Sequence, residues 1–200
     1  SVNLEEYESW KNIPEFIPDL VRMLDNVIEF FIQHAPSSLE KAKYSAMRER
    51  SIGLGAMGFH AYLQRHNIAF ESAMAKSFNM RAFSHIKSSA LEASQQLAAE
   101  KGECPDGVGH GIRNAHLLAI APNASSSIIC GNTSPSIEPY RANAFTQKTK
   151  SGTSLLKNEY LEHVLDEIGM NNDEVWKDIM THGGSVQHLD FLDTWTKDVF

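Results

Sequence analysis

The 200-residue sequence is poor in cysteine, in long apolar runs and in positive charge. Its two cysteines, Cys104 and Cys130, are too few for the disulfide framework of a small secreted protein, so we expect a reducing compartment, the cytoplasm. No apolar run is long enough to span a membrane, and no signal-peptide pattern opens the chain. Lys and Arg number 18 against 25 Asp and Glu, and the net charge of -7 argues against a protein that wraps nucleic acid.

The composition that remains, 42% apolar and 22% charged, is that of an ordinary soluble globular protein with one sizeable core. Apolar residues recur at three- and four-residue intervals over residues 14–34, which predicts an amphipathic helix. Residues 39–50 predict a shorter and more basic helix. Further along, Ser72 is placed to cap a long helix that stops at Gly102.

The C-terminal part of the chain has the pattern of a strand followed by helices. Alternating residues predict a strand at 144–149, and Ser151–Gly152 predicts a turn. Three helical segments are then expected, namely residues 155–168, a segment capped by Asn172, and a segment that begins at Asp190 and runs to the chain end.

One stretch in the middle of the chain combines a strand, a helix start and small polar residues. Residues 116–121 have the length of a buried strand, and Pro122 ends it. Residues 123–127 supply Asn and Ser side chains where a short helix begins, and this helix is expected to end near Gly131. Such a helix start gathers free N–H groups, hydroxyls and the positive end of a helix dipole, which suits a phosphate. The alternative is that the Asn and Ser side chains only cap the helix.

The turn-rich segment that follows, residues 132–143, shifts the balance between these alternatives. It contains Ile137 and Tyr140 together with a Glu138/Arg141 pair, a mixture that an ordinary connecting loop does not need. Loops of this composition usually line a site, so the phosphate interpretation is favoured over the simple cap.

Residues 53–58, Gly-Leu-Gly-Ala-Met-Gly, match the dinucleotide-binding pattern G-x-G-x-x-G, and Glu71 lies near the position of that motif's acidic residue. The motif requires a full apolar strand before its first glycine, whereas only a stub around Ile52 is available here. We therefore favour the alternative, in which the glycines allow close backbone packing at a strand-to-helix corner.

The nine histidines raise the question of a metal site, above all His110 and His116 together with Cys104 and Cys130. None of these four residues has the paired C-x-x-C or H-x-x-x-H spacing of a zinc site, so we expect no metal in this chain. Cys130 is instead expected to be a small buried residue at the end of the Ser-rich helix.

The run APNASSSIICGNTSPSIEPYRANAFTQKTKSG, residues 121–152, resembles the large, catalytic subunit of aerobic class I ribonucleotide reductase. In that family a Pro-x-Ala-Ser-Ser/Thr turn precedes a Ser-Ile-Glu-Pro segment. Four further segments of the chain fall in the family's order and approximate spacing: RERSIGLGAMG, AFES, LEASQQLAAEKG and GGSVQHL. The compact link between Cys104 and Asn114 is similar to phage-type members, which would place the protein in a host cytoplasm.

The resemblance implies an α/β fold, a ten-stranded α/β barrel built from two five-stranded halves. Residues 1–200 would form a single, helix-rich segment of that barrel domain, part of its second half with the outer helices. In the family this segment lies in mid-protein, and the chain begins at Ser1 without an initiator Met. We therefore expect a piece of a larger subunit: a shortened chain, the product of a split gene, or a segment released by protein splicing.

The resemblance also implies a reaction, the reduction of a ribonucleoside diphosphate to its 2′-deoxyribonucleotide. A cysteine thiyl radical removes the ribose 3′ hydrogen, a cysteine pair supplies electrons, and a Glu handles the 3′ hydroxyl proton. All of these groups are expected outside residues 1–200, so no catalytic residue and no cofactor is assigned to this chain. In the full enzyme the radical would come from a metal-containing small subunit and the electrons from thioredoxin or glutaredoxin, with ATP and dNTP effectors bound elsewhere.

What the chain retains, by match to the motif, is the substrate diphosphate-binding turn. Its residues are Pro122, Asn123, Ala124, Ser125 and Ser126, and its donors are the backbone N–H groups, which Pro122 lacks, and the two hydroxyls. Some members carry a Glu at the position of Ala124. The Ser-Ile-Glu-Pro version of the next segment favours a diphosphate over a triphosphate substrate.

The expected partners are therefore a ribonucleoside diphosphate, the missing parts of the large subunit and the small subunit, with neither nucleic acid nor a membrane. A homo-oligomer is an open alternative. Two other functions are alternatives to the reductase interpretation. One is a non-catalytic phosphate- or nucleotide-binding module that uses the same turn, and the other is a structural fragment that self-associates through uncovered sheet edges and apolar faces.

Overall fold

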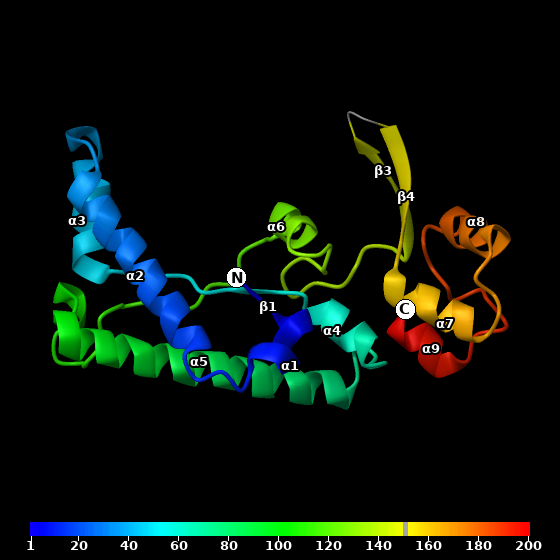
Figure 1. Cartoon of the computed structure of the whole chain (residues 1–200), viewed down its shortest axis with the longest axis horizontal. Helices are drawn as coiled ribbons and strands as arrows, with labels where there is room; N and C mark the ends of the chain where they lie inside the picture. Colours follow the sequence, from blue (N-terminus) through cyan, green and yellow to red (C-terminus); the bar gives the residue numbers. More distant parts are fainter. Residues whose placement is uncertain (150–151) are drawn as a thin grey trace.

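The computed structural model describes residues 1–149 and 152–200. Figure 1 shows an elongated arrangement in which one long helix runs beneath most of the N-terminal part, and a separate group of helices lies at one end. The turn predicted at Ser151–Gly152 falls partly outside the described residues. Within the described residues, no helix is long and apolar enough to cross a membrane.

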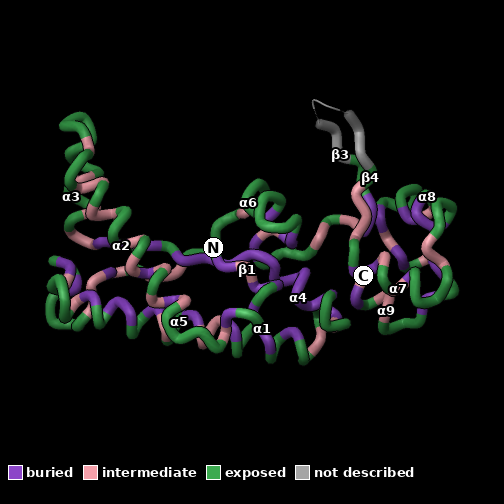
Figure 2. Tube along the Cα trace, viewed as in Figure 1, coloured by how far each residue is buried: buried purple, intermediate pink, exposed green. Residues whose placement is uncertain are grey.

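The long helix is α5 (Ala73–Lys101), and α2 (Phe16–His34) packs against it. Both helices were predicted, and both are confirmed. The N–H of Ala75 donates to Ser72 Oγ at 3.1 Å, so Ser72 caps α5 as expected, and the 29 residues give a helix roughly 44 Å long at about 1.5 Å per residue. Figure 2 shows the buried residues along α5, which belong to the larger of two apolar cores.

The predicted basic helix is α3 (Glu40–Glu49), and it ends at Arg50 in the left-handed conformation, with φ of 46°. This turn directs the Arg50 guanidinium at Asp25 of α2, whose carboxylate is fully buried and 2.9 Å from Arg50 Nε. Asn114 donates to the same carboxylate at 3.1 Å, and Arg113 Nε lies 3.5 Å from it. Burial opposes ionisation of Asp25, but the two guanidinium groups outweigh it and lower the pKa of this carboxyl.

A small parallel sheet joins the N-terminus to the middle of the chain. β1 (Val2–Asn3) pairs in parallel with β2 (Ala56–Met57). The residues just before β2, 52–54, bond to the segment 116–121 that was predicted as a strand. The N–H of Ile52 donates to the His116 carbonyl at 2.9 Å, and Leu54 forms a parallel bridge with Leu118. The predicted strand is thus present only as a bridged extended segment, because its far edge has no neighbour among the described residues.

The glycines of the G-x-G-x-x-G run lie where this sheet passes into α4 (Phe59–Arg65). A Cβ at Gly55 would come within 2.5 Å of the Ala119 carbonyl oxygen. A Cβ at Gly58, whose φ is +77°, would come within 2.3 Å of Asn3 Oδ1. The close-packing interpretation is confirmed, because neighbouring backbone and side-chain atoms lie where a side chain at either glycine would be.

The C-terminal part begins with an antiparallel hairpin of β3 (Ala144–Thr149), as predicted, and β4 (Gly152–Lys157). The prediction of a helix at 155–168 is wrong for its first turn, because Leu155 and Leu156 belong to β4 and pair with β3. The helix starts only after Asn158, whose side chain accepts from the N–H groups of Tyr160 and Leu161.

Three helices complete this part: α7 (Glu159–Glu167), α8 (Asp173–Thr181) and α9 (Thr194–Val199). Asn172 caps α8 as predicted, but α9 begins four residues later than Asp190, because Asp193 accepts from Thr196 and sets the start. Their apolar faces form the second core, in which Trp176 is 1% exposed. The fold is therefore α/β and helix-rich, with only short strands among the described residues.

Candidate functional site

The Ser-rich turn, residues 122–126, leads directly into α6 (Ala124–Ile129), the predicted short helix. The first backbone N–H to find an acceptor is that of Ser127, which donates to the Asn123 carbonyl at 2.9 Å. In the part of the chain that the structure describes, no acceptor faces the N–H groups of Ala124, Ser125 and Ser126, and all three residues are exposed. The turn thus presents three open donors at the positive end of a helix.

The side chain of Asn123 points back toward the sheet. Its Nδ2 donates to the Ala121 carbonyl at 2.9 Å, to the Ala56 carbonyl at 3.3 Å and to Ser1 Oγ at 3.0 Å. It therefore makes no cap on α6, and the simple capping interpretation is wrong for this residue. Asn123 instead fastens the start of the turn to β2 and to the first residue of the chain, which Figure 1 shows close to α6.

The serines do not cap the helix either. Ser127 is buried, and its hydroxyl donates to the Ala124 carbonyl at 3.3 Å. Ser125 and Ser126 make no side-chain hydrogen bond to any described residue. Their hydroxyls are therefore available beside the open N–H groups.

The segment 132–143 is held against α4 rather than lying free. The Ser134 hydroxyl accepts from the N–H of Ala61 at 3.0 Å, and its carbonyl accepts from the N–H of Gly58 at 2.8 Å. Ser134 thus satisfies donors at the start of α4 and is itself fully buried. The same segment contacts α4 again where the N–H of Tyr140 donates to His60 Nδ1 at 3.0 Å.

These contacts bury one titratable group, His60, and partly bury a second, Tyr140. Burial lowers the pKa of His60 to about 4, and burial also raises the pKa of Tyr140 above its usual value. The Glu138/Arg141 pair that the sequence suggested does not form an ion pair within the described chain. Glu138 instead accepts from the N–H of Ile137 at 3.2 Å.

The residues considered for zinc are placed separately. Cys104 is buried beside Gly107, and His116 Nδ1 lies 2.9 Å from the hydroxyl of Ser51. The prediction that Cys130 is buried is wrong, because α6 stands clear of both cores and its C-terminal residue Ile129 is 83% exposed.

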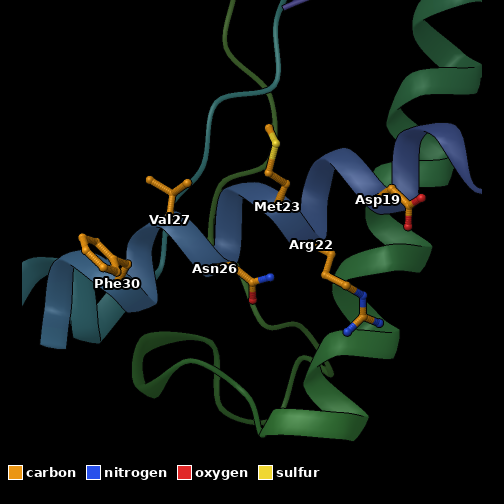
Figure 3. Close-up of a pocket in the computed structure, with 6 residues that line it drawn as sticks. All are labelled: Asp19, Arg22, Met23, Asn26, Val27 and Phe30. Carbon is orange, nitrogen blue, oxygen red and sulfur yellow. The ribbon is translucent and has the colours of Figure 1, made fainter.

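Two surface hollows lie outside the turn. One, of about 430 Å³, is formed by a single face of α2, and Figure 3 shows its lining residues Asp19, Arg22, Met23, Asn26, Val27 and Phe30. The other, of about 380 Å³, lies between α5, the segment that leads into the Ser-rich turn, and Ile137. Sequence reasoning missed this second hollow, and the only signal for it was an apolar residue, Ile137, in a polar loop.

Comparison with known proteins identifies the family. The family model for the ribonucleotide reductase barrel domain matches residues 1–107 and 105–200. The chain belongs to the ribonucleotide reductase barrel-domain family. A ribonucleoside-diphosphate reductase large subunit of Invertebrate iridescent virus 3 is 46% identical over 203 residues, which cover 100% of this chain and 32% of that protein.

A putative large subunit of Frog virus 3 is also 46% identical, over 100% of this chain and 36% of its own length. Among solved structures, the Actinobacillus ureae class Id ribonucleotide reductase alpha subunit matches with a TM-score of 0.91 and 40% identity, over 100% of this chain and 37% of that one. The chain therefore spans about a third of the length of these relatives. The resemblance drawn from the sequence motifs is confirmed, and the viral relatives accord with the phage-like character expected from the short link before Asn114.

Proposed function

We propose that this ribonucleotide reductase segment supplies the diphosphate-binding turn and part of the scaffold of a ribonucleoside-diphosphate reductase large subunit. The observation that carries the proposal is the Ser-rich turn, in which three consecutive N–H groups lie open and exposed at a helix start. The side chain that could have capped them, Asn123, is engaged on the opposite side by Ala56 and Ser1.

The chemistry of the turn suits a diphosphate group. The N–H groups of Ala124, Ser125 and Ser126 carry partial positive charge that the dipole of α6 reinforces, and they bind oxygen without any proton transfer. A hydrogen bond to a charged oxygen contributes about 1.5–3 kcal/mol, so two or three such bonds account for micromolar to millimolar binding of the group. Ala124 places no carboxylate beside the anion, in contrast to family members with Glu at this position.

The scaffold role follows from the uncovered edge of the small sheet. Ala119 and Ile120, in the segment that leads to the turn, are exposed, and Ile120 is 47% accessible. We propose that the remainder of the large subunit supplies the neighbouring strands and completes a ten-stranded barrel around this edge. The thiyl-radical cysteine, the reducing cysteine pair and the Glu of the reaction would come from that remainder.

We further propose the partners of the complete enzyme. The small subunit would supply the radical, thioredoxin or glutaredoxin the electrons, and ATP or dNTP effectors would bind outside residues 1–200. The two cysteines are unpaired, which suits a reducing cytoplasm. On this account the chain alone binds an anion but turns over no substrate.

The test is reconstitution of a complete large subunit that carries this segment, assayed with its small subunit for reduction of a ribonucleoside diphosphate. Ser125→Asp places a carboxylate where the phosphate would bind. Loss of two N–H contacts at about 1.5 kcal/mol each predicts roughly a hundredfold fall in kcat/KM. Ser88→Asp, an exposed residue on α5, adds the same charge elsewhere and is expected to leave kcat/KM unchanged.

Equal activity of the Ser125→Asp and Ser88→Asp enzymes would contradict the assignment of the turn. A complete subunit that binds nucleotide yet reduces none would favour the non-catalytic binding module. Such an enzyme would retain the effect of Ser125→Asp on binding.

The self-associating fragment remains a second candidate, because a specific surface favours it. Met23, Val27 and Phe30 lie on one face of α2, and each is more than half exposed, at 52%, 59% and 64%. An apolar face of this kind commonly marks a contact surface. Light scattering of the 200-residue chain tests this candidate: a monomer counts against self-association, and a dimer or larger species supports it.

A further inference from the structure

The C-terminal helices hold a cluster of one carboxylate and two imidazoles that the proposed function does not use. Asp178 and His182 lie one turn apart on α8, and His188 comes from the loop after it. His188 Nε2 is 2.9 Å from Asp178 Oδ2, and the two imidazole rings stack at 3.7 Å between centroids. One ligand atom of each residue lies within 4.8 Å of the other two.

The hydrogen bonds leave the nitrogens that bind metal accessible. His182 Nδ1 donates to the backbone carbonyl of Asp178 at 2.9 Å and lies 3.2 Å from Asp178 Oδ1, whereas Nε2 of this exposed ring has no hydrogen-bond partner among the described residues. A bond of this kind from one ring nitrogen is the usual way in which a metal-binding histidine is oriented. His188 already directs Nε2 at the carboxylate, so an ion there would replace the hydrogen that the two atoms share.

The spacing is close to that of a bound ion. Ligand atoms on tetrahedral zinc lie roughly 3.4 Å apart, given bonds of about 2.1 Å. Because the ligand atoms lie within 4.8 Å of one another in this structure, reaching that spacing takes a movement of at most about 1.4 Å by one side chain. The exposed ring of His182 can make this movement without disturbing a core.

The framework around the cluster is rigid. Trp176 and Ile179 of α8 are buried in the second core, and Val186 and Leu189, on either side in the loop, are 0% and 4% exposed. Gly184, at φ of +86°, accepts at its carbonyl from the N–H of Asn143 at 3.0 Å, which fixes the loop to the start of β3. The backbone that carries Asp178 and His188 is therefore held in place before any ion binds.

We propose that Asp178, His182 and His188 form a binding site for a divalent transition-metal ion of the zinc class, with water as the fourth ligand. Two imidazole nitrogens and one carboxylate oxygen suit Zn²⁺ or Co²⁺, whereas Ca²⁺ and Mg²⁺ require sites made of oxygen ligands. A bound ion would link α8 to the loop that follows it and would stabilise the C-terminal helices. The Ser-rich turn is on another part of the molecule, beside the N-terminus, as Figure 1 shows.

The test uses the untagged 200-residue chain carrying Cys130→Ser, because an exposed thiol binds the same ions. Titration with Co²⁺, followed by its visible absorption, is expected to saturate at one ion per chain, and Zn²⁺ is expected to displace it. Asp178→Asn and His182→Ala should each weaken binding by at least about tenfold. The matched control is His163→Ala, which removes an exposed histidine on α7 and should not change the affinity.

Two results would overturn the proposal. One is the absence of saturable binding by the parent chain, and the other is equal affinity of the His182→Ala and His163→Ala variants, which would show adventitious binding. His182 is 48% exposed, so its replacement leaves the fold intact and the comparison remains valid even where Asp178→Asn misfolds.

Discussion

The buried imidazole of His60 makes the stability of this protein depend on pH in a defined window. His60 is 6% exposed, it accepts from the N–H of Tyr140, and its ring packs against Phe70 and Tyr140 at 5.6 and 5.5 Å. Burial lowers its pKa from 6.5 to about 4. Protonation of Nδ1 therefore removes the hydrogen bond that His60 accepts from the N–H of Tyr140, and it places a positive charge among aromatic rings.

The sign and the magnitude follow from linkage. Between pH 6.5 and 4 the unfolded chain binds a proton at this position that the folded chain does not, so stability is fully present above pH 6.5 and falls as the pH is lowered. A shift of this size corresponds to about 3 kcal/mol in total. About 2 kcal/mol of this is lost between pH 7 and pH 5.

The assay is urea unfolding at pH 7 and pH 5 for the parent chain and for His60→Gln, whose amide oxygen can still accept from Tyr140. The free energy of unfolding of the variant should fall by about 2 kcal/mol less than that of the parent over this interval. His163→Gln, at an exposed position, should follow the parent. Parallel pH profiles for the parent and His60→Gln would show that His60 is not the group whose protonation lowers the stability.

Two further predictions concern other parts of the structure. Asp25→Ala leaves the buried Arg50 guanidinium with only the partly exposed Glu29 as a carboxylate partner, and it should lower the free energy of unfolding by about 3–5 kcal/mol. Glu100→Ala, at an exposed ion pair, should have little effect in the same urea titration. Equal free energies of unfolding for the two variants would show that the buried Asp25–Arg50 ion pair does not stabilise the fold. Phe30→Glu should shift any self-associated chain toward the monomer in light scattering, and an unchanged mass would exclude the α2 face as the contact.

Elements whose signals are local could be predicted from the sequence. α2 and α5 were found because their apolar spacing and the Ser72 cap are properties of the segments themselves. The start of the helix after β4 was missed because Leu155 and Leu156 have helical propensity, and only their pairing with β3 makes them a strand. The extended segment 116–121 was predicted as a complete strand, but a ladder also depends on neighbours that the sequence does not name.

The sequence predicted which residues form the candidate site, but not the contacts that their side chains make. The short helix after Pro122 could be expected from its Asn and Ser residues, yet their roles could not. Asn123 bonds to Ser1 and Ala56, more than 60 positions away along the chain, and no local rule indicates such a contact. The exposure of Cys130 had no local signal either, because it depends on α6 standing clear of the two cores.

The most direct measurement of the central claim is an NMR titration of the ¹⁵N-labelled 200-residue chain with inorganic pyrophosphate. We expect saturable shifts of the backbone amide signals of Ala124, Ser125 and Ser126, and the loss of these shifts in Ser125→Asp but not in Ser88→Asp. Saturable shifts confined to other helix starts, or amide signals of the turn that do not move at millimolar pyrophosphate, would contradict it.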